Sequence, residues 1–422
     1  MNKIERLLQT LAPKGVEFKT LEEVFEIRNG YTPSKNNPEF WKNGTIPWFR
    51  MEDLRENGRI LKDSIQHITP KALKGKKLFP KNSIIISTTA TIGEHALLIV
   101  DSLANQQFTF LSKKANCEIA LDMKFFFYQC FLLGEWCKNN TNVSGFASVD
   151  MTAFKKYKFP IPPLEIQQEI VKILDAFTEL NTELNTELNA RKKQYQYYQN
   201  MLLDFNDINQ NHKDAKERLA HKPYPKRLKT LLQTLAPKGV GFRKLGEVCE
   251  ILDNRRIPIA KNKRKPGIYP YYGANGIQDY IDSYIFDGDF VLVGEDGSVI
   301  NKDNTPVVNW ASGKIWVNNH AHVLQTKNEL KLKFLYFYLQ TIDVSYCVAG
   351  TPPKINQENL KKITIPIPPI EIQQEIVKIL DQFSALTTDL LAGIPAEIKA
   401  RKKQYEYYRE KLLTFKPLTP NK

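Results

Sequence analysis

The sequence contains only five cysteines among 422 residues, and no two of them stand at CxxC spacing. A zinc ribbon and a disulfide framework are therefore not indicated. Long hydrophobic runs are also absent, because the longest largely apolar stretch, Phe125–Leu133, is far shorter than the roughly 20 residues of a membrane-spanning helix. The first residues carry mixed charge and are not followed by the apolar segment of a signal peptide. These absences predict a soluble, cytoplasmic protein.

Motifs of enzyme active sites are missing as well. No phosphate-binding GxxxxGK[ST] loop occurs, and no GxGxxG follows an expected strand. His320 and His322 could bind a metal together with Glu295 and Asp296, but histidines satisfied by structural hydrogen bonds are the more common case. No nucleophile, base and orienting residue form a recognisable set. We therefore predict no catalytic residue and no metal site.

The sequence is instead rich in positive charge and in internal repetition. It has 60 lysines and arginines against 46 aspartates and glutamates, a net charge of +14. Its 42% apolar and 25% charged residues are typical of globular proteins. Residues 7–16 recur letter for letter at 231–240, and residues 160–177 recur at 366–383 with two differences. The segments between these blocks have diverged almost completely, so two similar frames hold two different inserts.

Each copy of the second block is expected to open a long helix. The Pro-Pro pair is typical of an extended segment followed by a helix start, and apolar residues then recur at steps of three and four, as in a coiled coil. Thr-Glu-Leu-Asn is written three times between Thr178 and Asn189, which interrupts the heptads with a stutter. In the second copy Pro395 should kink or interrupt the helix. We expect the two helices to pair through their apolar seams, namely Ile173, Phe177, Leu180, Leu184, Leu188, Ile379, Phe383, Leu386, Leu390 and Ile398.

These elements predict a pseudo-twofold internal repeat. Two variable domains would be separated by two long antiparallel coiled-coil helices. The expected boundaries are a variable domain at 1–160, a helix at 161–205, a polar linker at 206–226, a second variable domain at 227–362, a second helix at 363–415 and a tail at 416–422.

Basic residues gather in the inserts, beside amides and aromatic residues. Residues 255–265 hold six basic side chains and no acidic one. Lysine and arginine neutralise phosphates, and amides and arginine can read base edges. A charge run alone is more often a solvated surface, but duplicated frames without an active site favour sequence-reading modules. Our candidate DNA contacts are Arg28, Asn29, Tyr31, Ser34, Lys35, Asn36, Arg50, Thr89, Thr91, Gln106, Arg255, Arg256, Lys263, Arg264, Tyr271, Tyr272, Asn275 and Gln278.

Over essentially its whole length the chain resembles the specificity subunits of type I restriction–modification systems. The resemblance is carried by Ile-Pro-Pro-Leu-Glu-Ile-Gln-Gln-Glu-Ile at 161–170 and by its copy at 367–376. Shorter segments of the same kind stand at 11–16, 29–34, 46–48, 91–93, 105–107 and 350–352. Each segment alone is a weak signal, whereas their order and duplication are highly specific.

The resemblance implies an α+β fold with two target-recognition domains, each of mixed α/β structure. Each domain would read one half of a gapped, asymmetric site in double-stranded DNA. The helices would set the spacing, tuned by the Thr-Glu-Leu-Asn repeat, and would dock two methyltransferase (modification) subunits, which restriction (motor-nuclease) subunits would join. The chain itself would be non-catalytic and bind no cofactor. S-adenosylmethionine, ATP and Mg²⁺ would belong to the partner subunits, and adenine would be the methylated base.

Three other interpretations remain open at this stage. The chain could be the recognition subunit of a type IIB-like enzyme, whose partner fuses methylation and cleavage. It could be a non-catalytic coiled-coil scaffold whose basic domains bind RNA or acidic proteins. A stand-alone enzyme would require a site that the sequence does not reveal.

Overall fold

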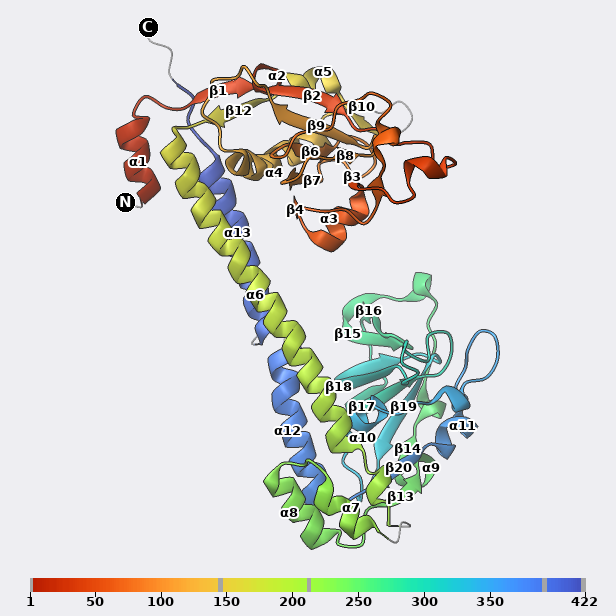
Figure 1. Ribbon diagram of the computed structural model, residues 1–422. Helices are drawn as coiled ribbons and strands as arrows, with labels where there is room; N and C mark the ends of the chain where they lie inside the picture. Colours follow the sequence, from red (N-terminus) through yellow and green to blue (C-terminus); the bar gives the residue numbers. More distant parts are fainter. Residues whose placement is uncertain (1–2, 143–146, 211–213, 389–392, 419–422) are drawn as a thin grey trace. The chain divides into compact units, whose positions relative to one another are not determined.

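The computed structural model describes residues 3–142, 147–210, 214–388 and 393–418. The chain divides into two compact units (Figure 1). Unit 1 comprises residues 1–183 and 398–422, and unit 2 comprises residues 184–397. Unit 1 therefore combines the N-terminal half of the chain with its C-terminal segment. No helix in the described part of the chain has the length and apolar composition needed to cross a membrane.

Unit 1 is built around a five-stranded sheet in the order β2-β9-β6-β7-β4, beside a three-stranded sheet β5-β3-β8. The strands of these sheets are β2 (Phe25–Asn29), β3 (Ile46–Phe49), β4 (Ile60–Leu61), β5 (His67–Ile68), β6 (Ile84–Ser87), β7 (His95–Leu98), β8 (Leu103–Ala104) and β9 (Phe108–Lys113). β6 is buried along its whole length, as its run of three isoleucines requires. Two short ribbons pair β1 (Glu17–Thr20) with β12 (Lys158–Ile161) and β10 (Thr141–Asn142) with β11 (Ser148–Val149).

Shorter helices also belong to unit 1, and one of them packs against β6 and β7 of the five-stranded sheet. They are α1 (Lys3–Leu11), α2 (Leu21–Val24), α3 (Met51–Asn57), α4 (Met123–Asn139) and α5 (Met151–Lys155). The carboxylate of Asp122 caps α4 by accepting hydrogen bonds from the backbone N–H groups of Lys124 and Phe125. The aromatic residues that follow in α4 are buried against the sheet, so the apolar stretch seen in the sequence is a core helix.

Unit 2 contains one six-stranded sheet in the order β14-β19-β17-β18-β15-β16. Its strands are β14 (Cys249–Ile251), β15 (Pro266–Gly273), β16 (Gly276–Ile281), β17 (Phe286–Gly294), β18 (Val308–Val317) and β19 (Ala321–Thr326). A separate ribbon pairs β13 (Gly241–Lys244) with β20 (Thr364–Ile367). The shorter helices are α7 (Ala215–His221), α8 (Lys226–Leu235), α9 (Leu245–Val248), α10 (Leu332–Leu339) and α11 (Gln357–Lys362).

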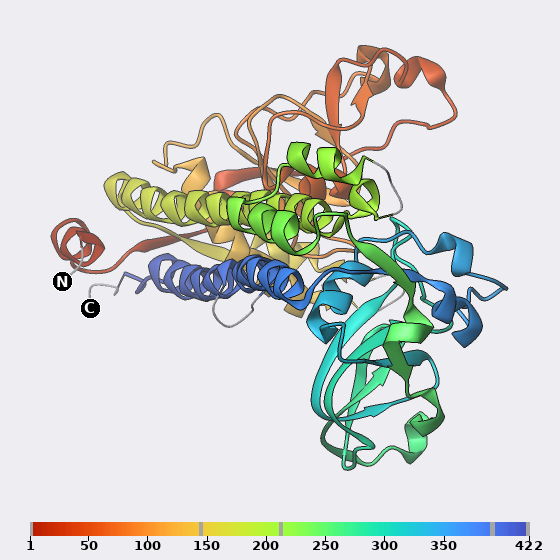
Figure 2. The ribbon, with the colours of Figure 1, turned by 90° about the horizontal axis from the view of Figure 1, so that it is seen from below.

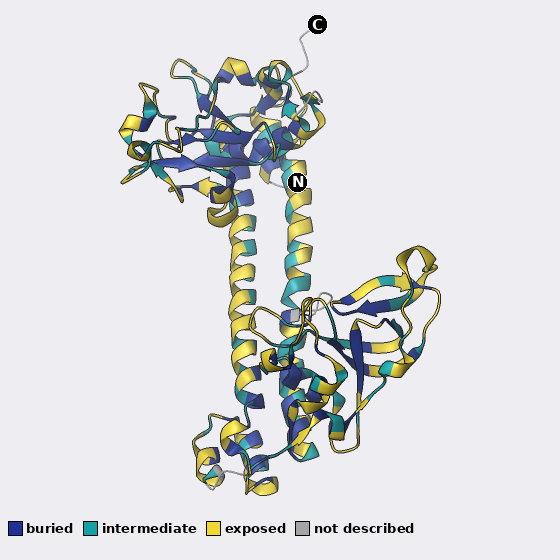
Figure 3. Cartoon of the chain, turned by 90° about the vertical axis from the view of Figure 1, so that its right-hand side faces the viewer, coloured by how far each residue is buried: buried dark blue, intermediate teal, exposed yellow. Residues whose placement is uncertain are grey.

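The long helices follow the predicted seam. α6 (Leu164–Leu203) is continuous over 40 residues, whereas the second copy is divided into α12 (Ile370–Thr388) and α13 (Ile394–Leu413). Pro395 is the second residue of α13, where its missing N–H interrupts no helical hydrogen bond. Leu390 lies outside the described residues. The middle of α6 is largely exposed, and buried residues concentrate in the sheets and near the helix ends (Figure 3).

Within each unit the helices pair in antiparallel fashion. In unit 1 the ring centroids of Phe177 and Tyr408 lie 5.7 Å apart, and α6 runs beside α13 (Figure 2). In unit 2 the rings of Tyr198 and Phe383 lie 5.0 Å apart, which joins α6 to α12. Phe177 and Phe383 thus take part in equivalent contacts, as the repeat predicts, and pairing through the other seam residues stays a prediction. The structure confirms the predicted α+β class.

The repeat extends to the packing of the helix that opens each sequence copy, α1 in unit 1 and α8 in unit 2. The carboxylate of Glu169 lies 2.6 Å from the ammonium of Lys3, and that of Glu375 lies 3.0 Å from the guanidinium of Arg227. These four residues occupy equivalent positions in the two copies. In each copy the same kind of ion pair therefore anchors the opening helix to the long helix.

The segments predicted as linker and tail both make ordered contacts. The predicted linker at 206–226 contains a 3₁₀ turn at Asn206–Ile208 and the helix α7, and it buries Leu219 and Tyr224. The predicted tail pairs with the start of unit 1, because the backbone of Val16 exchanges hydrogen bonds with Lys416 and Leu418. A Cβ on the preceding Gly15, whose φ is +108°, would lie 2.5 Å from the carbonyl oxygen of Pro417. The domain boundaries at 206–226 and 416–422 stay predictions, and the described residues of both segments pack on the rest of the chain.

Candidate nucleic-acid interface

In unit 1 most predicted DNA contacts gather at one edge of the five-stranded sheet. β2 ends at Asn29, β6 ends at Ser87 and β9 begins at Phe108. Because these three strands are antiparallel neighbours, the loops that leave them meet at the same edge. The predicted contacts at these strand ends and on the loops that leave them are Asn29, Tyr31, Ser34, Lys35, Asn36, Thr89, Thr91 and Gln106.

Hydrogen bonds connect these edge loops to one another. The hydroxyl of Thr32 is hydrogen-bonded to the amide oxygen of Gln106. The amide nitrogen of Gln107 donates to the hydroxyl of Thr91 at 3.0 Å and to the backbone oxygen of Thr89 at 3.3 Å. The loops therefore form one connected surface, on which Ser34, Lys35, Asn36 and Gln106 are exposed. Whether these side chains contact DNA stays a prediction.

Arg28 and Arg50 stand on the same domain but are already partly neutralised. The Nε atom of Arg28 lies 3.1 Å from a carboxylate oxygen of Glu26, and its guanidinium lies 4.6 Å from the centre of the Phe79 ring. Arg50 lies 3.7 Å from the carboxylate of Glu52. Both side chains are half-buried, so packing fixes their position.

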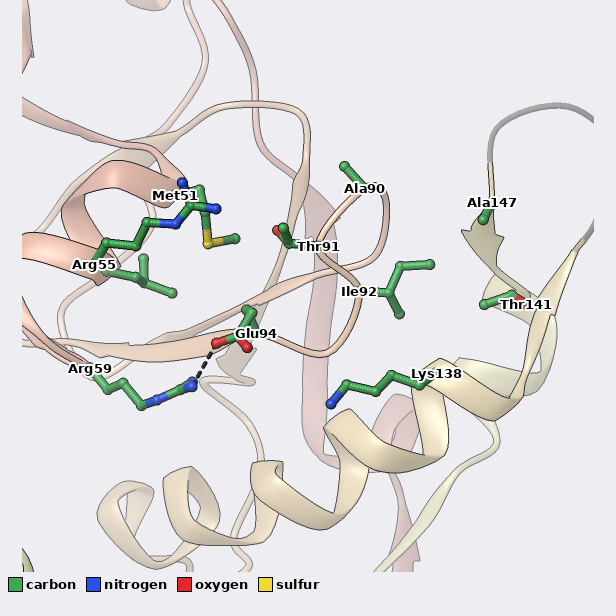
Figure 4. Close-up of a pocket in the computed structure, with 11 residues that line it drawn as sticks. Met51, Arg55, Arg59, Ala90, Thr91, Ile92, Glu94, Lys138, Thr141 and Ala147 are labelled. Atoms are coloured by element: carbon green, nitrogen blue, oxygen red, sulfur yellow. Dashed lines mark hydrogen bonds and ion pairs between the residues drawn. The ribbon is translucent and has the colours of Figure 1, made fainter. Parts of the chain in front are cut away.

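A cavity of about 740 Å³ adjoins this edge and contains basic residues that the sequence did not single out (Figure 4). Its lining includes Arg55, Arg59, Lys138 and Glu94. Arg59 is bound to the carboxylate of Glu94, with 2.6 Å between nitrogen and oxygen. The ammonium of Lys138 lies 2.6 Å from the carboxylate of Glu135, so two of the three cations of the lining are already paired. No sequence signal could have found these residues, because they come from three separate segments of the chain.

His95 follows the cavity residue Glu94 in the chain and is fully buried. Burial, reinforced by the charge of Arg59, lowers the pKa of His95 to about 3, although a hydrogen bond to the carbonyl oxygen of Gly93 opposes the shift. Its ring packs edge-on against Phe127 and Phe131. The imidazole is therefore neutral in the folded chain at neutral pH.

This buried histidine predicts acid sensitivity of unit 1. The unfolded chain binds a proton at His95 below about pH 6.5, whereas the folded chain does not until about pH 3. Between these values each pH unit of acidification should lower the free energy of unfolding by about 1.4 kcal/mol, which amounts to about 2 kcal/mol from pH 7 to pH 5. Urea unfolding at pH 7 and at pH 5, monitored by hydrogen exchange of β6 and β7, measures this change in the free energy of unfolding. The His95→Phe variant should lose this part of the pH dependence, and an unchanged slope in that variant would contradict the assignment.

In unit 2 several predicted contacts are exposed. Arg255 and Lys263 reach the surface, and the guanidinium of Arg255 lies 4.7 Å from the centre of the Phe286 ring. Asn275 and Gln278 are exposed on the hairpin formed by β15 and β16. Arg264 is half-buried and stacks 4.1 Å from the centre of the Tyr271 ring. These residues keep their place as predicted contacts.

Three predictions in unit 2 need correction, because the side chains face the interior. Tyr271 and Tyr272 are only 1% and 8% exposed, and the hydroxyl of Tyr271 accepts a hydrogen bond from the backbone N–H of Ile259. Arg256 is 11% exposed, and its guanidinium lies 2.6 Å from the carboxylate of Glu295. These groups hold the fold of the insert, so we no longer count them as DNA contacts.

Arg256 belongs to a buried ionic network that orders the basic insert. The Nδ1 atom of His322 lies 2.6 Å from a carboxylate oxygen of Asp253, and Nε2 lies 2.8 Å from the carbonyl oxygen of Ile355. Burial alone would raise the pKa of Asp253, but the hydrogen bond and charge of His322, with Arg256, lower it below its ordinary value. Asp253, Glu295 and His322 stand close enough to share a metal ion. Their hydrogen bonds and the guanidinium between the carboxylates instead make them a structural network.

The two histidines considered as joint metal ligands do not share a site. His322 is buried in this network, whereas His320 precedes β19, is largely exposed and contacts Asp296. A spacing of two residues puts both rings on one face only when both residues lie in a strand, and β19 begins at Ala321.

Comparison with known proteins identifies the relatives of this chain. Residues 13–194 and 237–400 match the type I restriction modification DNA specificity domain. The EcoprrI specificity subunit of Escherichia coli, a type I restriction enzyme subunit, is 40% identical over 406 residues, covering 92% of this chain and 93% of its own. The EcoR124I/EcoR124II specificity subunit of Escherichia coli is 34% identical over 203 residues, covering 45% of this chain and 48% of its own.

Solved structures agree on the fold. The S subunit of the type I restriction–modification system of M. genitalium has a TM-score of 0.55 at 15% identity, covering 94% of this chain and 96% of its own. Two family domains, matched in the two repeats of one chain, account for the duplicated frame with divergent inserts. The chain belongs to the DNA specificity subunits of type I restriction–modification systems.

Proposed function

We propose that each unit reads one half of a gapped, asymmetric sequence in double-stranded DNA. The observation that carries this proposal is the contrast between two equivalent frames and two unlike inserts. The edge loops of unit 1 and the basic segment with the β15–β16 hairpin of unit 2 share no pattern of side chains, so they would read different bases. Specificity subunits of type I systems are non-catalytic, and methyl transfer and cleavage would take place on partner subunits.

The long helices would serve as spacer and docking surface. We propose that two methyltransferase subunits bind them and that restriction subunits complete the assembly. S-adenosylmethionine, ATP and Mg²⁺ would be bound by these partners. The uninterrupted run of α6 through the Thr-Glu-Leu-Asn repeats supports a spacer role, because each four-residue repeat adds about 6 Å of helix. The family assignment favours this arrangement over the type IIB-like alternative and over an RNA-binding scaffold.

An exchange of one insert tests the proposal. Replacing residues 20–155 by the corresponding segment of another family member should change one half of the methylated sequence and leave the other half and the gap unchanged. Single-molecule methylome sequencing of cells that express the chimaera with its methyltransferase partner reads both halves directly. If both halves changed, the assignment of one half-site to each unit would be wrong.

A further inference from the structure

The hairpin of β15 and β16 in unit 2 gathers large apolar side chains at the surface. Among the large apolar side chains exposed in the described part of the chain, four lie within residues 268–284, namely Ile268, Ile277, Tyr280 and Tyr284. Ile268 is 79% exposed, the highest value among them. Single exposed apolar residues are common on protein surfaces, whereas a group of them on one element is typical of a contact site.

This hairpin lies at one edge of its sheet, because β16 is the last strand in the order of the six-stranded sheet (Figure 1). An exposed edge strand with apolar side chains can pair with other chains, and proteins usually protect such edges with charges or cover them. We therefore expect a binding partner to cover the apolar side chains of this hairpin.

A β-bulge turns Ile268 outward. Pro266 and Tyr269 both lie opposite Ile281, so Gly267 and Ile268 are two extra residues in β15. Bulges of this kind re-aim side chains and are frequent next to functional sites. A Cβ on Gly267 would lie 2.3 Å from the carbonyl oxygen of Ile281, so a glycine is required where the two strands approach. The bulge thus holds the side chain of Ile268 out of the core.

Positive charge accompanies these apolar side chains. Residues 261–282 contain four basic residues against two acidic ones, and one basic residue, Arg264, is paired with Asp279 at 3.5 Å. The other three, Lys261, Lys263 and Lys265, are exposed directly before the bulge. Lysines at the surface attract phosphates. The partner that fits this hairpin is therefore a polyanion that also carries apolar groups.

The major groove of duplex DNA offers both features. The C5 methyl group of thymine is an apolar group in that groove, between two phosphate backbones, and apolar side chains contact it. The groove also admits a two-stranded β-ribbon, which is the form of the β15–β16 hairpin. Gln278 is exposed on the same hairpin, and a glutamine amide can pair with adenine. An A·T pair would satisfy both kinds of side chain.

We infer that Ile268 reads the C5 methyl group of a thymine in the half-site recognised by unit 2 and is a specificity-determining residue. This inference rests on the proposed function, which supplies the DNA duplex. Cytosine has no methyl group at this position, so the contact favours an A·T pair over a G·C pair.

Replacement of thymine by uracil tests the inference, because it removes the methyl group and keeps the base pairing. The half-site of unit 2 is the half that stays unchanged when residues 20–155 are exchanged. The full chain, in complex with its methyltransferase partner, is titrated with duplexes in which each thymine of that half is replaced in turn. The wild-type complex should lose about fourfold in affinity at one thymine, as expected for one buried methyl group.

Variants of Ile268 assign this difference to one side chain. Ile268→Ala should bind the thymine and uracil duplexes equally well, and Ile268→Val should keep most of the preference for thymine. Ile99→Ala in unit 1, at a side chain that is 46% exposed, is the matched control and should keep the fourfold difference. Because Ile268 is largely exposed, its replacement should leave the fold unchanged, which circular dichroism checks.

Contradictory results would separate the inference from the proposed function. Equal affinity of the wild-type complex for thymine and uracil at every position, or an unchanged preference in Ile268→Ala, would overturn the role of Ile268. If Ile268→Ala kept the preference but lost a methyltransferase subunit in native mass spectrometry, the apolar side chains would belong to a protein contact. Failure of the wild-type complex to distinguish this half-site from a scrambled duplex would instead overturn the proposed function.

Discussion

Replacing Gln167 with alanine should loosen unit 1 and leave unit 2 unchanged, and Gln373→Ala should do the reverse. Both glutamines are fully buried near the start of a long helix. The amide nitrogen of Gln167 donates to the carbonyl oxygens of Pro162 and Ala120 at 2.7 and 2.9 Å, and its oxygen accepts from the backbone N–H of Asp122 at 2.8 Å. One side chain thereby ties the Pro-Pro turn, the start of α4 and the long helix together.

Gln373 makes the same three contacts in unit 2, with Pro368, Glu329 and Lys331. Alanine would leave three backbone groups buried without partners. At about 1 kcal/mol for each lost hydrogen bond, the expected cost is about 3 kcal/mol in the unit concerned.

Hydrogen exchange with mass spectrometry resolves the two units and measures this cost. In Gln167→Ala, exchange should rise about 100-fold in α4 and in the first turns of α6, while α10 and α12 keep the protection of the wild type. The neighbouring Gln168→Ala and Gln374→Ala are matched controls, because these glutamines are exposed and their loss should cost less than about 0.5 kcal/mol. Equal loss of protection in both units would contradict the separate anchoring of each unit.

The frame of this fold could be predicted from the sequence because its signals are local. A Pro-Pro pair followed by apolar residues at steps of three and four specifies a helix wherever it occurs, and its duplication specifies two. The stacking of Phe177 on Tyr408 and of Tyr198 on Phe383 follows from that seam. The role of Gln167 could not be read in this way, because its partner Ala120 lies 47 residues away.

The candidate interface was predictable only in part, because some of its contacts join residues that are far apart in the sequence. Residues such as Asn29 and Gln106 follow or precede strand ends, and polar loops at strand ends belong to the surface. Arg256 looked like one more member of a basic run, but Glu295, 39 residues further along the chain, draws its guanidinium inward. Tyr271 stands in a strand rich in aromatic residues, and composition alone does not tell which face of that strand is buried.

Glu295→Ala should destabilise unit 2 more than any other single change to its charged residues that we consider. The carboxylate of Glu295 lies 2.6 Å from the guanidinium of Arg256 and 3.1 Å from the ammonium of Lys354, and its side chain is 13% exposed. Removing it would leave the guanidinium of Arg256 largely buried and paired only with Asp253, at 3.4 Å. Breaking a buried ion pair by deleting one partner costs about 3 to 5 kcal/mol.

The same network should make unit 2 sensitive to strong acid. Because the pKa of Asp253 is lowered in the folded chain, its contribution is present above the ordinary carboxyl pKa of about 4 and is lost as the pH falls below it. Protonation of Asp253 would remove the acceptor of His322, whose other ring nitrogen is hydrogen-bonded to the carbonyl oxygen of Ile355.

In Glu295→Ala the segment from Asp253 to Arg256 and the segment before α11 should loosen together, and hydrogen exchange of both segments at pH 7 measures this. The exposed Glu250→Ala is the matched control and should leave both protected, whereas loosening of the first segment alone would show that the network does not couple them.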